Sequence, residues 1–256
     1  MDWVSESAPP ASLVAQIGDF AESGRATRAF AEGGIPYFEN AFWTAGQRQA
    51  HPIHEISYRA CFKPQLPAFF IRRLTAPGDL AYDPFMGRGT TPVEAALIGR
   101  RAAGNDSNPL GVLLTRPRLN PPTPDQVAAA LAAVDWDAGA AEPEELLAFY
   151  SPATLRRLNA LRTWLDRHAP LADHNPDPVA DWIRMVALNR LTGHSPGFFS
   201  AYTMPPNQAV SVAAQRRINE RLGQTPPDRD VAAIFAKKTR ALLAKPMPFP
   251  ALPFRL

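Results

Sequence analysis

The chain has 256 residues, 46% of them hydrophobic and 20% charged, and a formal net charge of +3. This size permits one sizeable core with an appended subdomain, and the mild positive charge permits a polyanionic partner without requiring one. The single cysteine, Cys61, excludes an internal disulfide framework, and the sequence shows neither a run of eighteen apolar residues nor, at its N-terminus, the basic-then-apolar pattern expected of a secretory leader. We therefore expect a cytoplasmic protein without a membrane partner.

The N-terminal stretch to about residue 31 predicts a helix that packs on the main sheet. Its apolar residues recur at helical spacing: Leu13, Val14, Ile17 and Phe20. Gly33 and Gly34 are expected to break this helix, and aromatic residues follow up to position 43. We interpret residues 1–48 as an N-terminal helical and aromatic segment.

Two histidines and an amphipathic helix come next. His51 and His54 are interpreted as loop residues, because no cysteine or acidic cluster at ligand spacing accompanies them. We therefore expect no metal site. Apolar residues between Gln65 and Leu74 predict a helix that is ended by Pro77-Gly78.

The most informative stretch is Asp83-Pro84-Phe85-Met86-Gly87-Arg88-Gly89-Thr90-Thr91. The preceding run from Leu80 to Tyr82 predicts a buried strand, with Asp83 at its carboxyl end, where open α/β sheets bind ligands. Gly87 and Gly89 allow a sharp turn and a close approach to a ligand. Downstream, a threonine N-cap, a proline and a glutamate predict a helix start with a capping box: Thr91, Pro92 and Glu94.

The predicted helix stops at Gly99, a second strand follows over Arg100–Ala103, and Asp106 comes after its far end. Strand, glycine turn, helix, strand and acid predict a nucleoside-binding half-sheet in which Asp106 accepts hydrogen bonds from ribose hydroxyls. A dinucleotide fingerprint would need a glycine in place of Pro92, and a phosphate-binding P-loop would need a lysine. Both of these sites are therefore disfavoured.

This pattern resembles the S-adenosylmethionine site of the DNA amino-methyltransferases, which methylate N4 of cytosine or N6 of adenine. Their loop, Asp-Pro-Phe-x-Gly-x-Gly-Thr-Thr, is matched at every defined position by residues 83–91. Their next element, Gly-Arg, Gly-x-Asp/Glu and a proline, is matched by Gly99-Arg100, Gly104-Asn105-Asp106 and Pro109. Residues 54–56 and 62–67 resemble the segment that caps the methionine end of the cofactor, so the resemblance covers about residues 50–118.

The resemblance implies an α/β fold, with a partial Rossmann-like methyltransferase sheet at residues 49–118 that binds S-adenosylmethionine. A large helical subdomain is expected at 119–245, and a proline-rich tail without another strand at 246–256. The residues implied to bind the cofactor are Lys63, Pro64, Asp83, Pro84, Phe85, Gly87, Gly89, Thr90, Thr91 and Asp106.

In the helical part, a proline-punctuated stretch from Pro117 to Pro124 is interpreted as a boundary before a helix over 125–134. The loop from His194 to Gln208 is aromatic and amide-rich and precedes a basic helix, which favours contact with double-stranded DNA by stacking and by amide pairing to base edges. A rigid proline loop that buttresses the helices is the alternative. The candidate DNA contacts are Phe199, Tyr202, Asn207, Gln208, Arg216 and Arg217.

The family's catalytic motif is Asp, Asn or Ser, then Pro-Pro, then an aromatic residue. Asn120-Pro121-Pro122-Thr123 lacks the aromatic residue, and Met204-Pro205-Pro206-Asn207 lacks both the acceptor and the aromatic residue. No catalytic residue is assigned. We therefore expect the cofactor-binding part of a DNA amino-methyltransferase that needs a second chain or a missing C-terminal region for catalysis.

A sheet of two or three strands has an unpaired edge, which favours a partner chain or a homo-oligomer. The alternative to an enzyme is a non-catalytic module, derived from a methyltransferase, that binds the cofactor or DNA.

Overall fold

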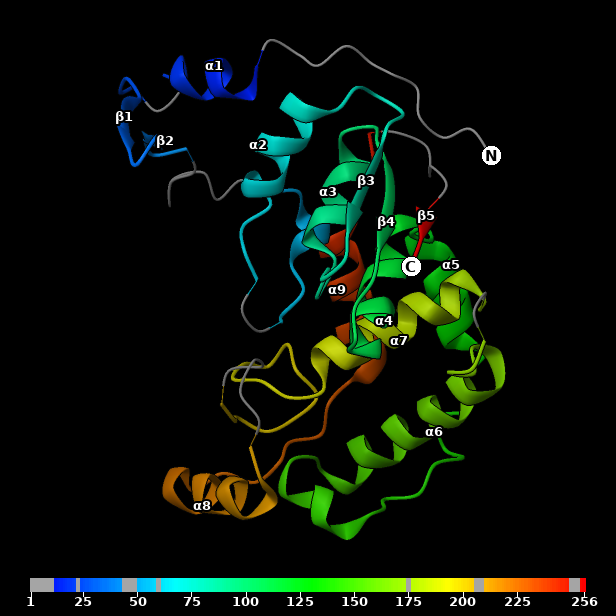
Figure 1. Cartoon of the computed structure of the whole chain (residues 1–256). Helices are drawn as coiled ribbons and strands as arrows, with labels where there is room; N and C mark the ends of the chain where they lie inside the picture. Colours follow the sequence, from blue (N-terminus) through cyan, green and yellow to red (C-terminus); the bar gives the residue numbers. More distant parts are fainter. Residues whose placement is uncertain are drawn as a thin grey trace.

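The computed structural model describes residues 12–21, 24–42, 50–58, 61–173, 176–204, 210–248 and 254–256. These residues form a mixed α/β protein with two small sheets and many helices (Figure 1). The α/β class is therefore confirmed at this level. Among the described helices, none is long and apolar enough to cross a membrane.

The N-terminal segment differs from the predicted long helix. Helix α1 covers only Leu13–Gly18 and packs against a later helix, α2. Strands β1 (Arg28–Glu32) and β2 (Ile35–Glu39) then form an antiparallel hairpin. Gly33 and Gly34, with φ of +59° and +79°, supply the hairpin turn. The prediction took these glycines for a helix break, although a two-residue Gly-Gly turn between short strands is a strong hairpin signal.

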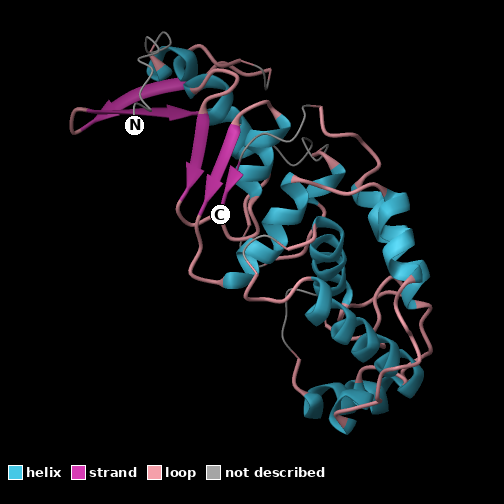
Figure 2. Cartoon of the chain, turned by 90° about the vertical axis from the view of Figure 1, so that its right-hand side faces the viewer, coloured by secondary structure: helices cyan, strands magenta, loops and turns pink. Residues whose placement is uncertain are grey.

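The main sheet has three parallel strands in the order β3-β4-β5 (Figure 2). Strand β3 covers Leu80–Asp83 and β4 covers Arg101–Gly104, and helix α3 (Thr90–Leu97) connects them. Helix α2 (Gln65–Leu74) precedes β3, as predicted, and a short 3-10 helix, η1 (Pro52–His54), lies upstream of it. The predicted succession of strand, glycine turn, helix and strand is therefore present.

The tail contributes a strand that the prediction missed. Strand β5 (Phe254–Arg255) pairs with β4, with Phe254 opposite Ala102. Phe254 and Leu256 also pack against the apolar cluster of the sheet. A two-residue strand has no readable periodicity, so only the tertiary position of the tail reveals it.

Strand β3 is not buried as predicted. Of its residues only Ala81 is buried, and it faces the cluster formed with Val93 and Ala102. Leu80 and Tyr82 are 53% and 59% exposed, because successive side chains point to opposite faces of a sheet. Their face of β3 remains open to solvent.

The rest of the chain is helical, as predicted for residues 143–243. The helices are α4 (Pro109–Leu119), α5 (Pro124–Ala132), η2 (Glu144–Ala148), α6 (Pro152–His168), α7 (Pro178–Arg190), α8 (Val212–Leu222) and α9 (Val231–Leu242). One expected boundary is wrong, since Pro117 lies inside α4 and not in a linker. Burial of Pro117 and Leu119 in the tertiary structure outweighs the helix-breaking tendency of proline here.

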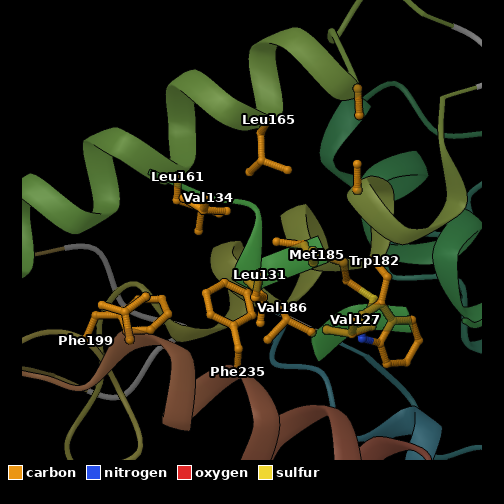
Figure 3. Packing of buried hydrophobic residues seen from close by; sticks show 14 of the residues in the cluster. Val127, Leu131, Val134, Leu161, Leu165, Trp182, Met185, Val186, Phe199 and Phe235 are labelled. Atoms are coloured by element: carbon orange, nitrogen blue, oxygen red, sulfur yellow. The ribbon is translucent and has the colours of Figure 1, made fainter. Parts of the chain in front are cut away.

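The helices enclose the larger of two apolar clusters (Figure 3). Its centre is α7, where Trp182, Ile183 and Met185 are fully buried. The indole N–H of Trp182 donates to Thr239 Oγ1 at 3.1 Å, which satisfies the polar atom of a buried ring. Helix α4 joins this cluster to the sheet's cluster, because Leu114 belongs to the first and Leu119 to the second.

A bidentate ion pair fastens α4 to α7. Arg116 donates through Nε and Nη2 to the carboxylate of Asp181, at 2.7 and 2.9 Å, and the Asp181 side chain is 3% exposed. On the exposed hairpin, by contrast, Arg28 pairs with Glu39 at 3.2 Å with both side chains in solvent.

We predict that Asp181→Ala lowers the free energy of unfolding by about 3 kcal/mol, because it leaves the Arg116 guanidinium partly buried without its carboxylate. The control, Glu39→Ala, removes an exposed pair and should cost less than about 1 kcal/mol. Urea unfolding followed by circular dichroism measures both. Equal losses in the two variants would contradict the structural role given to the α4–α7 pair.

Candidate functional site

The glycine loop after β3 is a tight turn held by its own hydrogen bonds. Asp83 Oδ1 accepts a hydrogen bond from the backbone N–H of Phe85 at 3.0 Å, so the carboxylate caps the start of the loop. The Gly89 N–H donates to the Met86 carbonyl at 2.7 Å. Gly87 and Gly89 have φ of +53° and +76°, in the left-handed region that glycine adopts without strain.

Asp106, beyond the end of β4, binds the same loop. Its Oδ2 accepts from the Gly87 N–H at 2.7 Å, and its Oδ1 accepts from the Asn108 N–H at 2.8 Å. Each carboxylate oxygen can accept a second hydrogen bond, so Asp106 retains acceptor capacity for a ligand hydroxyl. Asn108 caps α4 by accepting from the Leu110 N–H.

Helix α4 packs so closely on the loop that side chains are excluded at two glycines. A Cβ on Gly111 would lie 2.6 Å from the Gly87 carbonyl oxygen. A Cβ on Gly89 would lie 2.1 Å from Thr115 Oγ1. The glycines therefore permit contact between the loop backbone and α4, in addition to the turn itself.

A buried guanidinium completes this attachment. Arg118, which is 0% exposed, donates to the backbone carbonyls of Leu114 at 2.7 Å and of Arg88. Burial, with a smaller contribution from the Arg88 charge, lowers the pKa of Arg118 to about 9. Because its acceptors are carbonyls of α4 and of the loop, Arg118 holds the loop to the helix.

The predicted capping box is not formed. The N-cap of α3 is Gly89, and Thr91 lies inside the helix. Glu94 instead pairs with His54, whose Nε2 lies 2.9 Å from Glu94 Oε2. Burial lowers the pKa of His54, although Glu94 opposes the shift. The described part of the chain contains no group of three His, Cys, Asp or Glu side chains placed to hold a metal ion.

The structure brings together part of the predicted cofactor set. Residues 83–91 and Asp106 form one cluster, in which the Phe85 side chain is 86% exposed and Thr90 is buried. Pro64 belongs to a separate hollow of about 300 Å³, shared with His51 and Glu94. The Lys63 side chain is exposed.

Two residues that the sequence reasoning missed lie at the loop. A Cβ on Gly87 would be 3.4 Å from the ring of Tyr58, so the tyrosine covers the first glycine. The amide of Asn108 donates to the Tyr58 hydroxyl at 3.3 Å. The Asn-Pro pair two residues after Asp106 signals an N-cap followed by a helix, and could have identified Asn108. No local signal identifies Tyr58.

Of the predicted DNA-contact residues that the structure describes, one is buried and three are exposed. Phe199 is fully buried against Phe235, with ring centroids 5.6 Å apart (Figure 3), which corrects its assignment as a base-stacking residue. Tyr202 is 47% exposed, and Arg216 and Arg217 are exposed on α8. Asn207 and Gln208 lie outside the described residues.

We predict that Gly89→Ala destabilises the protein by at least about 2 kcal/mol more than Gly78→Ala. Both glycines have positive φ, +76° and +87°, but a Cβ on Gly78 would meet nothing within 4 Å. The difference between the two variants, measured by urea unfolding, isolates the clash with Thr115. A difference near zero would mean that the loop and α4 are not in contact.

Comparison with known proteins finds similarity in the segment that contains the glycine loop. Residues 36–112 match a family model described as DNA methylase. Two curated relatives are a Type II methyltransferase, M.MjaII, of Methanocaldococcus jannaschii and a Type II methyltransferase, M.MvaI, of Kocuria varians. The first is 38% identical over 72 residues, which are 28% of this chain and 13% of that protein. The second is 32% identical over 82 residues, 31% of this chain and 18% of that protein.

The matched segment is therefore a small share of both relatives, and no solved structure matches the chain significantly. It contains the glycine loop, β4 and Asp106, which are the elements that carried the resemblance. Over residues 36–112 the chain is similar to the DNA amino-methyltransferases that modify N4 of cytosine or N6 of adenine, as its sequence predicted.

Proposed function

We propose that this chain is the S-adenosylmethionine-binding part of a DNA amino-methyltransferase that acts on N4 of cytosine or N6 of adenine in double-stranded DNA. The observation that carries the proposal is the position of Asp83, the last residue of β3, and Asp106, just beyond the end of the adjacent parallel strand β4, around a glycine loop. This end of a parallel sheet is where ligands bind in open α/β folds. Residues 49–118 would form the cofactor half and 119–245 a helical subdomain, flanked by 1–48 and the tail at 246–256.

The residues present suit the cofactor. The carboxylate of Asp106 would accept from the ribose hydroxyls, while Asp83 would hold the loop and receive the amino group of the methionine moiety. Gly87 and Gly89 leave the backbone bare where the ligand would pass. When bound, S-adenosylmethionine supplies an electrophilic methyl group on a sulfonium.

Methyl transfer to an exocyclic amine also requires an acceptor for the amine's hydrogen bonds and a ring that holds the flipped base. The printed sequence has four Pro-Pro pairs, and an aromatic residue follows none of them: they begin at Pro9, Pro121, Pro205 and Pro226. We infer that the catalytic loop is supplied by a second polypeptide or by a further region of the protein.

The open side of the sheet supports this inference. Among the described residues, β3 pairs only with β4, so one edge of β3 has no strand beside it. Leu80 and Tyr82 are exposed on the open face of the same strand. A partner that extended the sheet along β3 would pair the free backbone groups and cover these side chains.

A non-catalytic module that binds cofactor or DNA is the second candidate, and the missing aromatic residue after every Pro-Pro pair favours it. For either candidate we propose that Tyr202, Arg216 and Arg217 contact DNA. The two arginines lie on α8. Gln215 of the same helix donates to the Tyr202 carbonyl at 2.9 Å, which holds the Tyr202 backbone beside α8.

We predict that Asp106→Ala weakens S-adenosylmethionine binding at least about tenfold, which corresponds to the loss of one charge-assisted hydrogen bond. The control is Asp79→Ala at the opposite end of β3, where Asp79 Oδ2 likewise accepts a backbone N–H, from Ala76 at 2.8 Å. Isothermal titration calorimetry should find that Asp79→Ala binds S-adenosylmethionine with unchanged affinity. Unchanged affinity in Asp106→Ala and also in Asp83→Ala would refute the cofactor assignment.

We predict no methyl transfer to duplex DNA by the chain alone, and transfer when a polypeptide that carries an acceptor-Pro-Pro-aromatic motif, encoded by the neighbouring gene, is added. Labelled cofactor reports the reaction. Leu80→Lys with Tyr82→Lys should abolish the stimulation and leave cofactor binding intact, since lysines block strand addition. Leu171→Lys, at a leucine that is 70% exposed in the loop after α6, is the control. Turnover by the chain alone would refute the need for a partner.

A further inference from the structure

A hollow of about 580 Å³ lies beside the glycine loop, between the sheet and the helices. Its wall is built from five places in the chain: the segment 55–58, the loop residue Arg88, the last residue of α7, the loop after α7, and α9. The hollow contains three permanent or potential cations, which are Arg88, Arg190 and Lys238, together with His194.

Backbone carbonyls hold two of these cations in place. Arg88 Nη1 donates to the Ile56 carbonyl, and Lys238 Nζ donates to the Glu55 carbonyl at 2.6 Å. These bonds fix the positions of the charged groups without neutralising them. Both side chains are half-buried, so a bound ligand would be partly shielded from water.

The third cation, Arg190, is oriented by its neighbours. It donates to the carbonyl and the side-chain oxygen of Asn189, at 3.0 and 2.6 Å. Its guanidinium lies over the ring of Phe198, with the Cζ atom 4.2 Å from the ring centroid. Asn189 occupies Nε and one N–H of Nη2, so Nη1 and the remaining N–H of Nη2 form the edge that could donate to phosphate oxygens.

The cations outnumber the acidic groups of this hollow. Its only lining carboxylate is Glu55, and none of the three cations forms an ion pair within 4 Å in the described part of the chain. Lys238 and Arg190 lie close enough to repel each other: burial first, and then the Arg190 charge, lower the pKa of Lys238 to about 8. A bound anion would relieve this repulsion.

We propose that this hollow binds a backbone phosphate of the DNA substrate, with Arg190 and Lys238 as the principal ligands and Arg88 beside the loop. The inference rests on the proposed function for the identity of the polyanion. Phosphate oxygens are the acceptors that Arg and Lys donors most commonly meet in nucleic-acid complexes.

The position of the hollow gives this phosphate site a role in orienting the substrate. Arg88 lies between Gly87 and Gly89, and Tyr58 both lines the hollow and covers Gly87. A strand held here by its phosphate would pass directly beside the proposed cofactor loop. Contacts on α8 would then act at a distance from the reaction, whereas this site would set the register of the strand against the methyl donor.

The test is fluorescence anisotropy with a labelled duplex of about 20 base pairs, titrated at several salt concentrations. Arg190→Gln with Lys238→Gln should weaken binding at least about tenfold at low salt and reduce the slope of log affinity against log salt by about one, since one lost phosphate contact contributes about 0.9. The matched control is Lys237→Gln with Arg240→Gln, which removes the same charge from the exposed face of α9 and should change the affinity less than about threefold.

A variant that gains affinity for DNA cannot owe its effect to misfolding. Glu55→Gln removes the only carboxylate among the described residues that line the hollow. It should tighten DNA binding about threefold, because it removes one solvent-screened repulsion between a carboxylate and the phosphate. Equal losses in the two double variants, or no gain from Glu55→Gln, would overturn the phosphate site. Tighter binding to an RNA duplex than to DNA would also overturn it.

Two further measurements separate this proposal from the function on which it rests. If the wild-type chain binds duplex DNA but not S-adenosylmethionine, the proposed function fails and the phosphate site can stand. If both ligands bind, and only Arg216→Gln with Arg217→Gln on α8 weakens DNA binding, the phosphate site fails and the proposed function stands.

Discussion

The contact between the glycine loop and α4 is the constraint on which the site depends. Gly111, Thr115 and Arg118 are spaced so that they share one face of the helix, and all three meet the loop backbone. Asp106 fixes the same loop from the end of β4. The loop is therefore shaped before any ligand arrives, and binding need not bear the entropic cost of ordering it. The same helix joins the two apolar clusters, so the loop is supported by the whole core.

The sequence predicted the local geometry of the glycine loop better than that of its surroundings. Residues 83–91 and Asp106 could be placed because strand ends, positive-φ glycines and an acid after the second strand are local features. Thr91 was misread as an N-cap because Gly89 approaches Thr115 of α4, which no local pattern reports. The same limitation explains the fully buried Phe199, whose environment is made by α9, and the strand β5, which exists only through pairing with β4.

We propose that this arrangement is half of a reaction centre. On one side of the loop, two carboxylates and bare backbone suit a cofactor; on another, a hollow with three cations suits a polyanion. No Pro-Pro pair of the chain combines an acceptor before it with an aromatic residue after it, as the chemistry would require. The open edge and exposed face of β3 lie on the sheet that carries the loop, where a completing segment could dock. The glycine loop and the open edge of the sheet thus support the same proposal, a cofactor-binding part that a further segment completes.

The central claim, that the loop itself receives S-adenosylmethionine, is tested most directly by nuclear magnetic resonance of the ¹⁵N-labelled chain. Addition of the cofactor should shift the amide resonances of Gly87 and Gly89, while those of Gly33 and Gly34 in the exposed hairpin turn stay in place. Cofactor binding that leaves the resonances of Gly87 and Gly89 unchanged, or the absence of any shift at saturating cofactor, would contradict the account.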